Sequence, residues 1–155
     1  MGSGKSAVGV LVAQRAGAVF HDLDLLIESE AGMTISELFA TRGEAAFRAL
    51  ESRLLPTVLM PGAVVALGGG APLDDENWRL IAERSVTVFL DCEFDTVWQR
   101  TSGTTSRPLA AGRSRDELEA LLHARLPRYR EAVHVVDGDR PPDVVASEIL
   151  EIWSD

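Results

Sequence analysis

The sequence predicts an α/β fold in which helices flank a mostly parallel sheet. Two observations indicate it: short runs rich in β-branched residues alternate with helical spans, and a phosphate-binding pattern opens the first helix. We expect strands at Ala18–Phe20, Ala63–Leu67, Val86–Asp91 and His134–Val136. The 155 residues contain neither an internal repeat nor a linker, so they predict a single domain over residues 1–155.

The chain opens on part of a phosphate-binding loop. Residues 1–6 read M-G-S-G-K-S and match the second half of the pattern G-x-x-x-x-G-K-[ST], in which backbone N–H groups cradle phosphate oxygens. The residues from Lys5 to Ala16 suit a helix whose N-terminus would direct N–H groups and the positive end of its dipole at an anion. We therefore expect a nucleotide site at the start of the chain.

Two carboxylates follow the strand Ala18–Phe20 at D-x-D spacing. Asp22 and Asp24 would point toward the crevice in which open α/β sheets bind ligands. One of them could hold Mg²⁺, an ion that takes only one or two protein carboxylates, and the other could accept a substrate hydroxyl or its proton. Alternatively, one of them does no more than cap the helix Leu25–Ala31.

Three consecutive glycines, residues 68–70, follow the strand Ala63–Leu67. Glycine at a strand end indicates either a turn that needs positive φ or a close approach of the backbone by a ligand. The position of the triplet, at the same sheet edge as the D-x-D pair, favours the ligand.

Local signals place three of the remaining helices. Thr34–Glu37 and Ser114–Glu117 match the capping box, a hydroxyl cap with glutamate three residues on, and Pro142 begins an amphipathic C-terminal helix. Residues 101–113 differ, because they hold Gly, Pro, Ser, Thr and Arg without an apolar period. A connection this long predicts a lid loop.

The charge balance excludes some classes of function. A net charge of −9 argues against a nucleic-acid surface, which needs a basic face, although a small polyanion can bind wherever a few arginines converge. No apolar run is long enough to cross a bilayer, so we expect no membrane association. The lone Cys92 fits a reducing cytoplasm.

Six motifs in one order and at one set of spacings resemble the shikimate kinase family. That family consists of P-loop kinases that use ATP to phosphorylate the 3-hydroxyl of shikimate, in the route to aromatic amino acids. The resemblance runs from Met1 to about Trp153 and implies a three-layer P-loop kinase fold with a lid. The motifs are Gly2-Ser3-Gly4-Lys5-Ser6, Phe20-x-Asp22-x-Asp24-x-x-Ile27-Glu28, Gly43-Glu44-x-x-Phe47-Arg48-x-x-Glu51, Gly68-Gly69-Gly70, Arg107-Pro108-Leu109 and Arg125-x-Pro127-x-Tyr129.

On the nucleotide side, the resemblance implies ATP and Mg²⁺ as the cofactors. Lys5 would reach the phosphates, Ser6 and Asp22 would position Mg²⁺, and Arg107 on the lid would close over the transferred phosphoryl group. Arg100 and Arg140 would flank the adenine. The implied nucleotide-binding residues are Gly2, Ser3, Gly4, Lys5, Ser6, Ala7, Arg100, Arg107 and Arg140.

On the substrate side, the resemblance implies that Arg48 and Arg125 grip the carboxylate of shikimate. Asp24 would contact the hydroxyls and is the candidate base, and the backbone at Gly69 and Gly70 would approach the ring hydroxyls. The substrate-binding helical region spans about residues 24–60. The chemistry agrees, because guanidinium forks bind carboxylates bidentately and phosphoryl transfer depends mainly on positioning and charge. Lys5, Asp24 and Arg107 are thus the expected catalytic residues, and we expect a monomer.

The resemblance also places a strand ahead of the phosphate loop, in mid-sheet between the strands that end at Leu67 and Asp91. That strand is not part of the sequence. We expect the functional protein to begin about ten residues upstream of Met1, which is one short strand plus the first loop residues.

Two alternatives remain open at this point. One is another small-molecule P-loop kinase, of the gluconate or nucleotide type, although the arginine motifs suit a small carboxylate better than a base. The other is a nucleotide-binding or interaction domain whose catalysis is impaired, because the first half of the phosphate loop lies outside the sequence.

Overall fold

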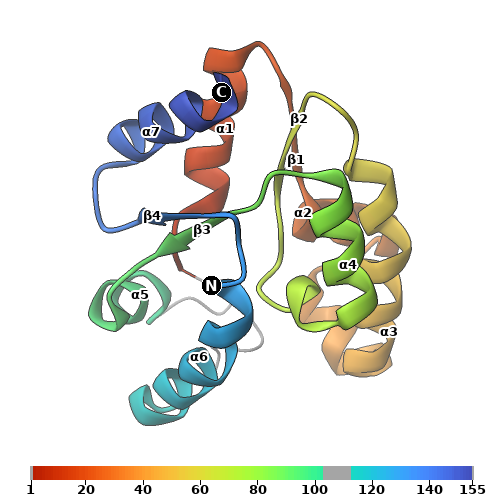
Figure 1. The fold of residues 1–155 in the computed structure, drawn as a ribbon. Helices are drawn as coiled ribbons and strands as arrows, with labels where there is room; N and C mark the ends of the chain where they lie inside the picture. Colours follow the sequence, from red (N-terminus) through yellow and green to blue (C-terminus); the bar gives the residue numbers. More distant parts are fainter. Residues whose placement is uncertain (1, 103–112, 155) are drawn as a thin grey trace.

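The computed structural model describes residues 2–102 and 113–154, in which four strands alternate with helices (Figure 1). The strands are β1 (Val19–Asp22), β2 (Ala63–Ala66), β3 (Val88–Asp91) and β4 (His134–Asp137). The helices are α1 (Lys5–Ala16), α2 (Leu23–Ala31), α3 (Ile35–Val58), α4 (Asp75–Arg84), α5 (Phe94–Thr101), α6 (Arg115–Tyr129) and α7 (Pro142–Ser154), with a short 3-10 turn η1 (Ala71–Leu73).

The strands form two separate parallel pairs. β1 pairs with β2 from Val19↔Ala63 to Asp22↔Ala66, and β3 pairs with β4 from Val88↔His134 to Asp91↔Asp137. Each of these four expected strands is present, with one or both ends shifted by one or two residues. The ends are set by how far the partner strand runs alongside. β1 therefore continues through Asp22, so the first aspartate of D-x-D belongs to the strand.

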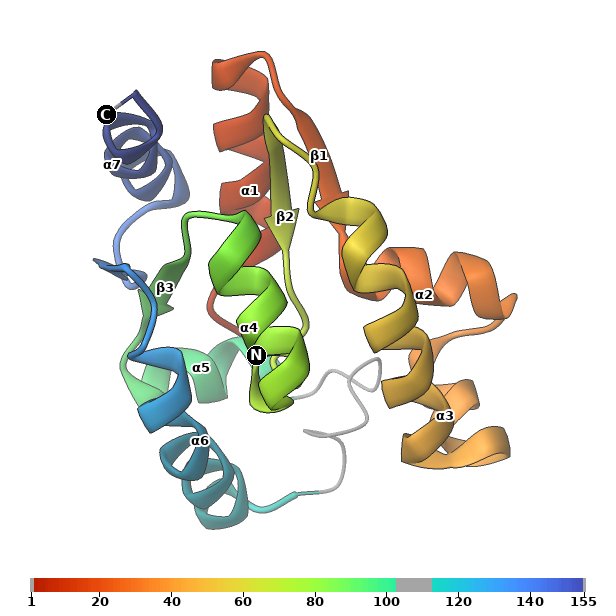
Figure 2. The ribbon, with the colours of Figure 1, turned by 45° about the vertical axis from the view of Figure 1, so that its right-hand side comes forward.

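A groove of about 1140 Å³ lies between β2 and β3, which are separate strands in Figure 2. Both strands line it, together with apolar side chains of α1 such as Val8 and Val12. Most of the expected lid, including Arg107, falls outside the described residues; Thr101, at the start of that range, is the buried last residue of α5.

Helix starts follow their local signals. Both capping boxes are present, at Thr34 before α3 and at Ser114 before α6, and α7 begins at Pro142 as expected. At the start of α5, Glu93 is at the cap position without a side-chain cap, and the Asp139 carboxylate accepts the Glu93 N–H at 2.8 Å.

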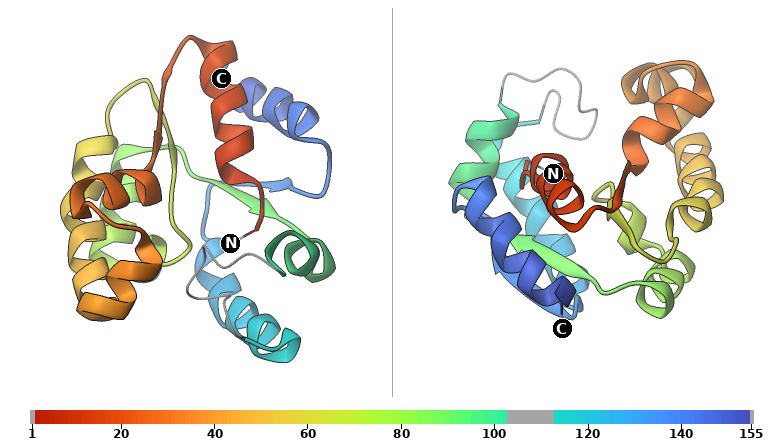
Figure 3. Two further views of the ribbon diagram at one scale, coloured as in Figure 1. Left: turned by 180° about the vertical axis from the view of Figure 1, so that it is seen from behind. Right: turned by 90° about the horizontal axis from the view of Figure 1, so that it is seen from above.

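Two hydrophobic clusters divide the molecule. One, between α2, α3 and α4, contains fully buried leucines and isoleucines such as Ile27, Leu55 and Ile81. The other joins α1 and α7 to β3 and β4, around Val12 and Val136. In the right panel of Figure 3, α1 lies between α5 and α7 on one side and α2 and α3 on the other. In residues 2–102 and 113–154, no helix combines the length and apolarity needed to span a membrane.

Candidate active site

The phosphate loop leads directly into α1. Gly4 occupies the N-cap position with φ 85° and ψ 14°, a left-handed conformation that favours glycine, and its carbonyl accepts the Val8 N–H at 3.0 Å. Lys5 Nζ donates to Ser3 Oγ at 3.3 Å. The first turn of a twelve-residue helix thus meets the loop, and its backbone N–H groups suit a phosphate.

Asp22 joins the loop to the second helix. Its Oδ2 accepts the Ser6 hydroxyl at 2.5 Å, while its Oδ1 accepts the N–H groups of Asp24 at 3.1 Å and Leu25 at 3.4 Å. Asp22 therefore caps α2 through one oxygen, while the other accepts the Ser6 hydroxyl of the phosphate loop; its role in holding Mg²⁺ stays a prediction. A hydroxyl and a carboxylate oxygen beside a phosphate site fit Mg²⁺, which keeps most of its remaining positions for phosphate and water.

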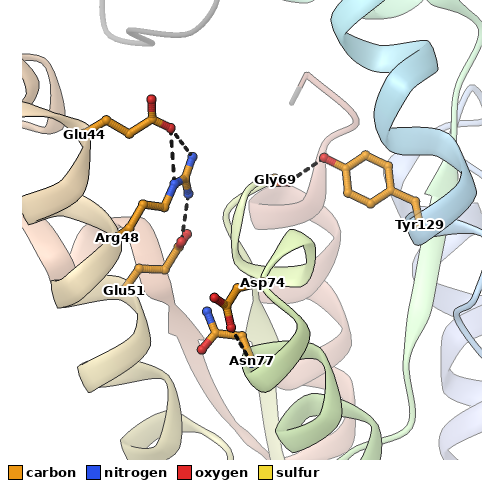
Figure 4. A network of polar contacts seen from close by, with 7 residues as sticks. All are labelled: Glu44, Arg48, Glu51, Gly69, Asp74, Asn77 and Tyr129. Carbon is orange, nitrogen blue, oxygen red and sulfur yellow. Dashed lines mark hydrogen bonds and ion pairs between the residues drawn. The ribbon is translucent and has the colours of Figure 1, made fainter.

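A charged cluster on α3 forms the wall of a second pocket (Figure 4). Arg48 Nη1 donates to Glu51 Oε2 at 2.7 Å, and its Nε and Nη2 donate to Glu44 Oε1 at 3.3 and 3.1 Å. The Glu51 side chain is 1% exposed, and burial raises the pKa of its carboxyl although Arg48 acts in the opposite direction. Its Oε1 has no hydrogen-bond partner among the described residues.

The glycine triplet lies against this cluster. A Cβ on Gly68 would lie 2.6 Å from Asp24 Oδ1 and 3.2 Å from Glu51 Oε1, and a Cβ on Gly70 would lie 1.9 Å from Arg48 Nη1. Neither of these glycines has a positive φ. A turn that requires positive φ is therefore excluded at these two positions, and the groups that closely approach the backbone there are the protein's own charged side chains.

Helix α6 closes the pocket from the other side. Arg125 is 8% exposed, and its charge acts on the pKa values of both Glu51 and Tyr129, so these groups converge. The Tyr129 hydroxyl donates to the Gly69 carbonyl at 2.5 Å. In Figure 4, Gly69 lies between α3 with Arg48 and α6 with Tyr129.

The two arginines expected near the adenine differ in their surroundings. Arg100 Nη1 donates to the Gly2 carbonyl at 3.3 Å and to the Gly138 carbonyl at 3.5 Å, which places it at the phosphate loop. Arg140 instead pairs with Glu148 on α7 and with Asp137. The described contacts of Arg140 thus link β4 to α7 and do not reach the loop.

Sequence reasoning assigned no role to Glu44, Glu51 or Tyr129, although all three lie within the quoted motifs. A signal was present, because Glu44 and Glu51 are four and three residues from Arg48 on one helix, and Tyr129 is four residues from Arg125. Side chains at these spacings share a helix face. The spacing alone does not tell which of them are buried.

Comparison with known proteins is consistent with this geometry. The family model for shikimate kinase matches residues 1–154. The shikimate kinase of Rhizobium meliloti (strain 1021) is 41% identical over 158 residues, covering 100% of this chain and 82% of its own length. That of Salinibacter ruber is 44% identical over 163 residues, covering 98% of this chain and 80% of its own.

Solved structures agree with these relatives. The shikimate kinase from Acinetobacter baumannii in complex with shikimate has a TM-score of 0.95 and 32% identity, and the match covers 99% of this chain and 88% of that one. The enzyme from Aquifex aeolicus has a TM-score of 0.88 and 34% identity, with 99% and 92% covered. With a family model over nearly its whole length and relatives above 40% identity, the chain belongs to the shikimate kinase family.

Proposed function

We propose that the chain transfers the γ-phosphoryl group of ATP to the 3-hydroxyl of shikimate, which yields shikimate 3-phosphate. The observation that carries this proposal is the link through Asp22 and Asp24. Asp22 bonds to Ser6 of the phosphate loop, and Asp24, two residues on, lies beside Gly68 in the pocket with Arg48. A phosphate site and a pocket with two convergent arginines are thereby joined by one short segment.

On the nucleotide side, the phosphates bind to the loop and the first turn of α1, with Lys5 as the cation that reaches the transferred group. Ser6 and Asp22 would hold Mg²⁺, which would supply charge neutralisation at the phosphate oxygens. Arg107 closes over the reacting group from the lid, and Arg100 and Arg140 flank the adenine. The residues assigned to the nucleotide are Gly2, Ser3, Gly4, Lys5, Ser6, Ala7, Arg100, Arg107 and Arg140.

On the substrate side, Arg48 and Arg125 bind the shikimate carboxylate. Both guanidinium groups are permanently charged and are held on rigid helices, which favours a planar, bidentate ligand. Asp24 orients the reacting hydroxyl and accepts its proton, and the backbone of Gly69 and Gly70 binds the ring hydroxyls. The pocket needs one chain only, so we propose that the protein acts as a monomer; the half-buried, unpaired Cys92 supports a cytoplasmic location.

A turnover assay with Mg-ATP tests the substrate. We expect shikimate-dependent ADP release and a shikimate-dependent rise in Tm, measured on the full-length protein. A panel that includes gluconate and nucleoside monophosphates covers the other small-molecule kinases. Turnover of one of these in place of shikimate, or the absence of both turnover and thermal shift with shikimate, would reject the assignment.

Calorimetry with ATP distinguishes an active kinase from an impaired nucleotide-binding domain. An active enzyme binds ATP and turns it over with shikimate, whereas an impaired domain binds weakly and releases no ADP. Light scattering after size exclusion checks the monomer.

A further inference from the structure

The glycine loop that binds substrate has few constraints of its own. Within it, the Ala71 N–H donates to the Gly68 carbonyl at 3.3 Å and the Leu73 N–H donates to the Gly70 carbonyl at 3.0 Å. Glycine peptides have no side chains to hold their orientation, so each peptide plane needs a hydrogen-bond partner to be fixed. The Gly69 carbonyl finds that partner on a different element, because it accepts the Tyr129 hydroxyl of α6 at 2.5 Å.

We propose that Tyr129 is a positioning residue that orients the Gly69–Gly70 peptide toward the substrate. The described peptide bonds are all trans, so the N–H of Gly70 points away from the carbonyl of Gly69. The bond to Tyr129 fixes the Gly69 carbonyl toward α6, so the Gly70 N–H points away from α6. In the part of the chain that the structure describes, this N–H donates no hydrogen bond, which leaves it for a ligand oxygen.

The surroundings of Tyr129 suit a fixed donor. Its ring packs against Phe89 of β3 with 5.5 Å between the ring centroids, and this contact restricts the movement of the side chain. Burial raises the pKa of its hydroxyl, against the opposing charge of Arg125, so the group is protonated and donates at neutral pH. A carbonyl can only accept, and the direction of this bond is therefore set.

The same contact aligns two parts of the pocket. Tyr129 lies one helical turn after Arg125, on the same face of α6. The bond to Gly69 thus ties the end of α6, which carries one carboxylate-binding arginine, to the loop that packs on the other, Arg48. Removing the Tyr129 hydroxyl should therefore weaken shikimate binding and leave the structure of the phosphate loop unchanged.

Tyr129→Phe tests this inference, which rests on the proposed function. The variant keeps the ring contact and removes only the hydroxyl. We expect the KM for shikimate to rise about fivefold, the usual worth of one hydrogen bond, with the KM for ATP within about twofold of wild type. The carbonyl ¹³C resonance of Gly69 in the substrate-free protein should also shift.

Phe89→Leu is the matched control, because it removes the ring partner and keeps the hydroxyl. It should lower Tm and raise the KM for shikimate less than Tyr129→Phe does, because the hydroxyl that bonds to Gly69 is still present. If Tyr129→Phe raises both KM values equally, or leaves the KM for shikimate unchanged in an active enzyme, Tyr129 is only a packing residue and the inference is wrong. A wild-type protein that does not phosphorylate shikimate would overturn the proposed function itself, and this inference with it.

Discussion

The substrate pocket and the phosphate loop are held in different ways. The pocket is made by charged side chains that bind one another, with Glu51 1% exposed beneath Arg48, above a cluster of ten described core residues. The phosphate loop is made mainly of backbone, and α5 contacts it through Arg100, whose Nη1 lies 3.3 Å from the Gly2 carbonyl. The hydrophobic cluster next to the phosphate loop, which joins α1 and α7 to β3 and β4, has six described buried residues.

This difference indicates two kinds of recognition. A small, rigid hydroxy acid benefits from side chains that are already in position, since little ordering is left to be done on binding. If N–H groups of the loop and helix bind the phosphates, as we propose, then the single cation Lys5 should matter more for the transfer step than for nucleotide affinity. Substitutions on the two sides should therefore separate in their kinetics.

Lys5→Ala should have the largest effect. Removing a cation that stabilises the transferred phosphoryl group should lower kcat roughly 100- to 1000-fold. The affinity for shikimate, measured by calorimetry without nucleotide, should stay within about twofold, because Lys5 contacts Ser3 and lies on the loop. A parallel loss of shikimate affinity would show that the two sides do not act separately.

Arg48→Ala should produce the converse pattern. Losing a charged bidentate partner should raise the KM for shikimate roughly 10- to 100-fold and leave the KM for ATP nearly unchanged. The variant should also melt earlier, because Glu51 is left buried without its partner. Arg79→Ala, which removes an arginine with a 74% exposed side chain on α4, is the control and should change none of these values.

Glu51→Gln should change the pH dependence of stability. The folded state raises the pKa of Glu51 above its ordinary value of 4.5, so the folded protein holds this proton more tightly than the unfolded chain does. Its contribution to the free energy of unfolding therefore falls as pH rises through the window above 4.5.

The variant has no such proton, and its stability relative to wild type should increase with pH over that window. Urea melts at several pH values measure the difference. A difference that is constant with pH, or that falls as pH rises, contradicts the prediction.

Glu44→Gln should have the smallest effect. Glu44 is largely exposed and occupies the Nε and Nη2 edge of Arg48, one of the edges through which a carboxylate can bind an arginine. Weakening this pair should lower the KM for shikimate about twofold, in keeping with the small worth of exposed ion pairs. An increase in KM would mean that Glu44 positions Arg48 instead of competing with the substrate.

Local signals predicted much of this molecule. The capping boxes at Thr34 and Ser114 depend on residues three apart, and the D-x-D pair follows from its place at a strand end, so both can be read along the chain. The burial of Glu51 could not be predicted in this way, since it depends on how closely α3 approaches Gly68. The contacts of Arg140 likewise depend on where α7 docks.

Lys5 is the only lysine among the 155 residues, so the phosphate loop contains the one ε-amino group of this sequence. An amine-directed acylating reagent consequently has a single side-chain target, besides the α-amino terminus. Protection of that target by ATP can be followed as a single mass increment on intact protein. The loop thus carries its own chemical reporter of nucleotide occupancy, without any engineered label.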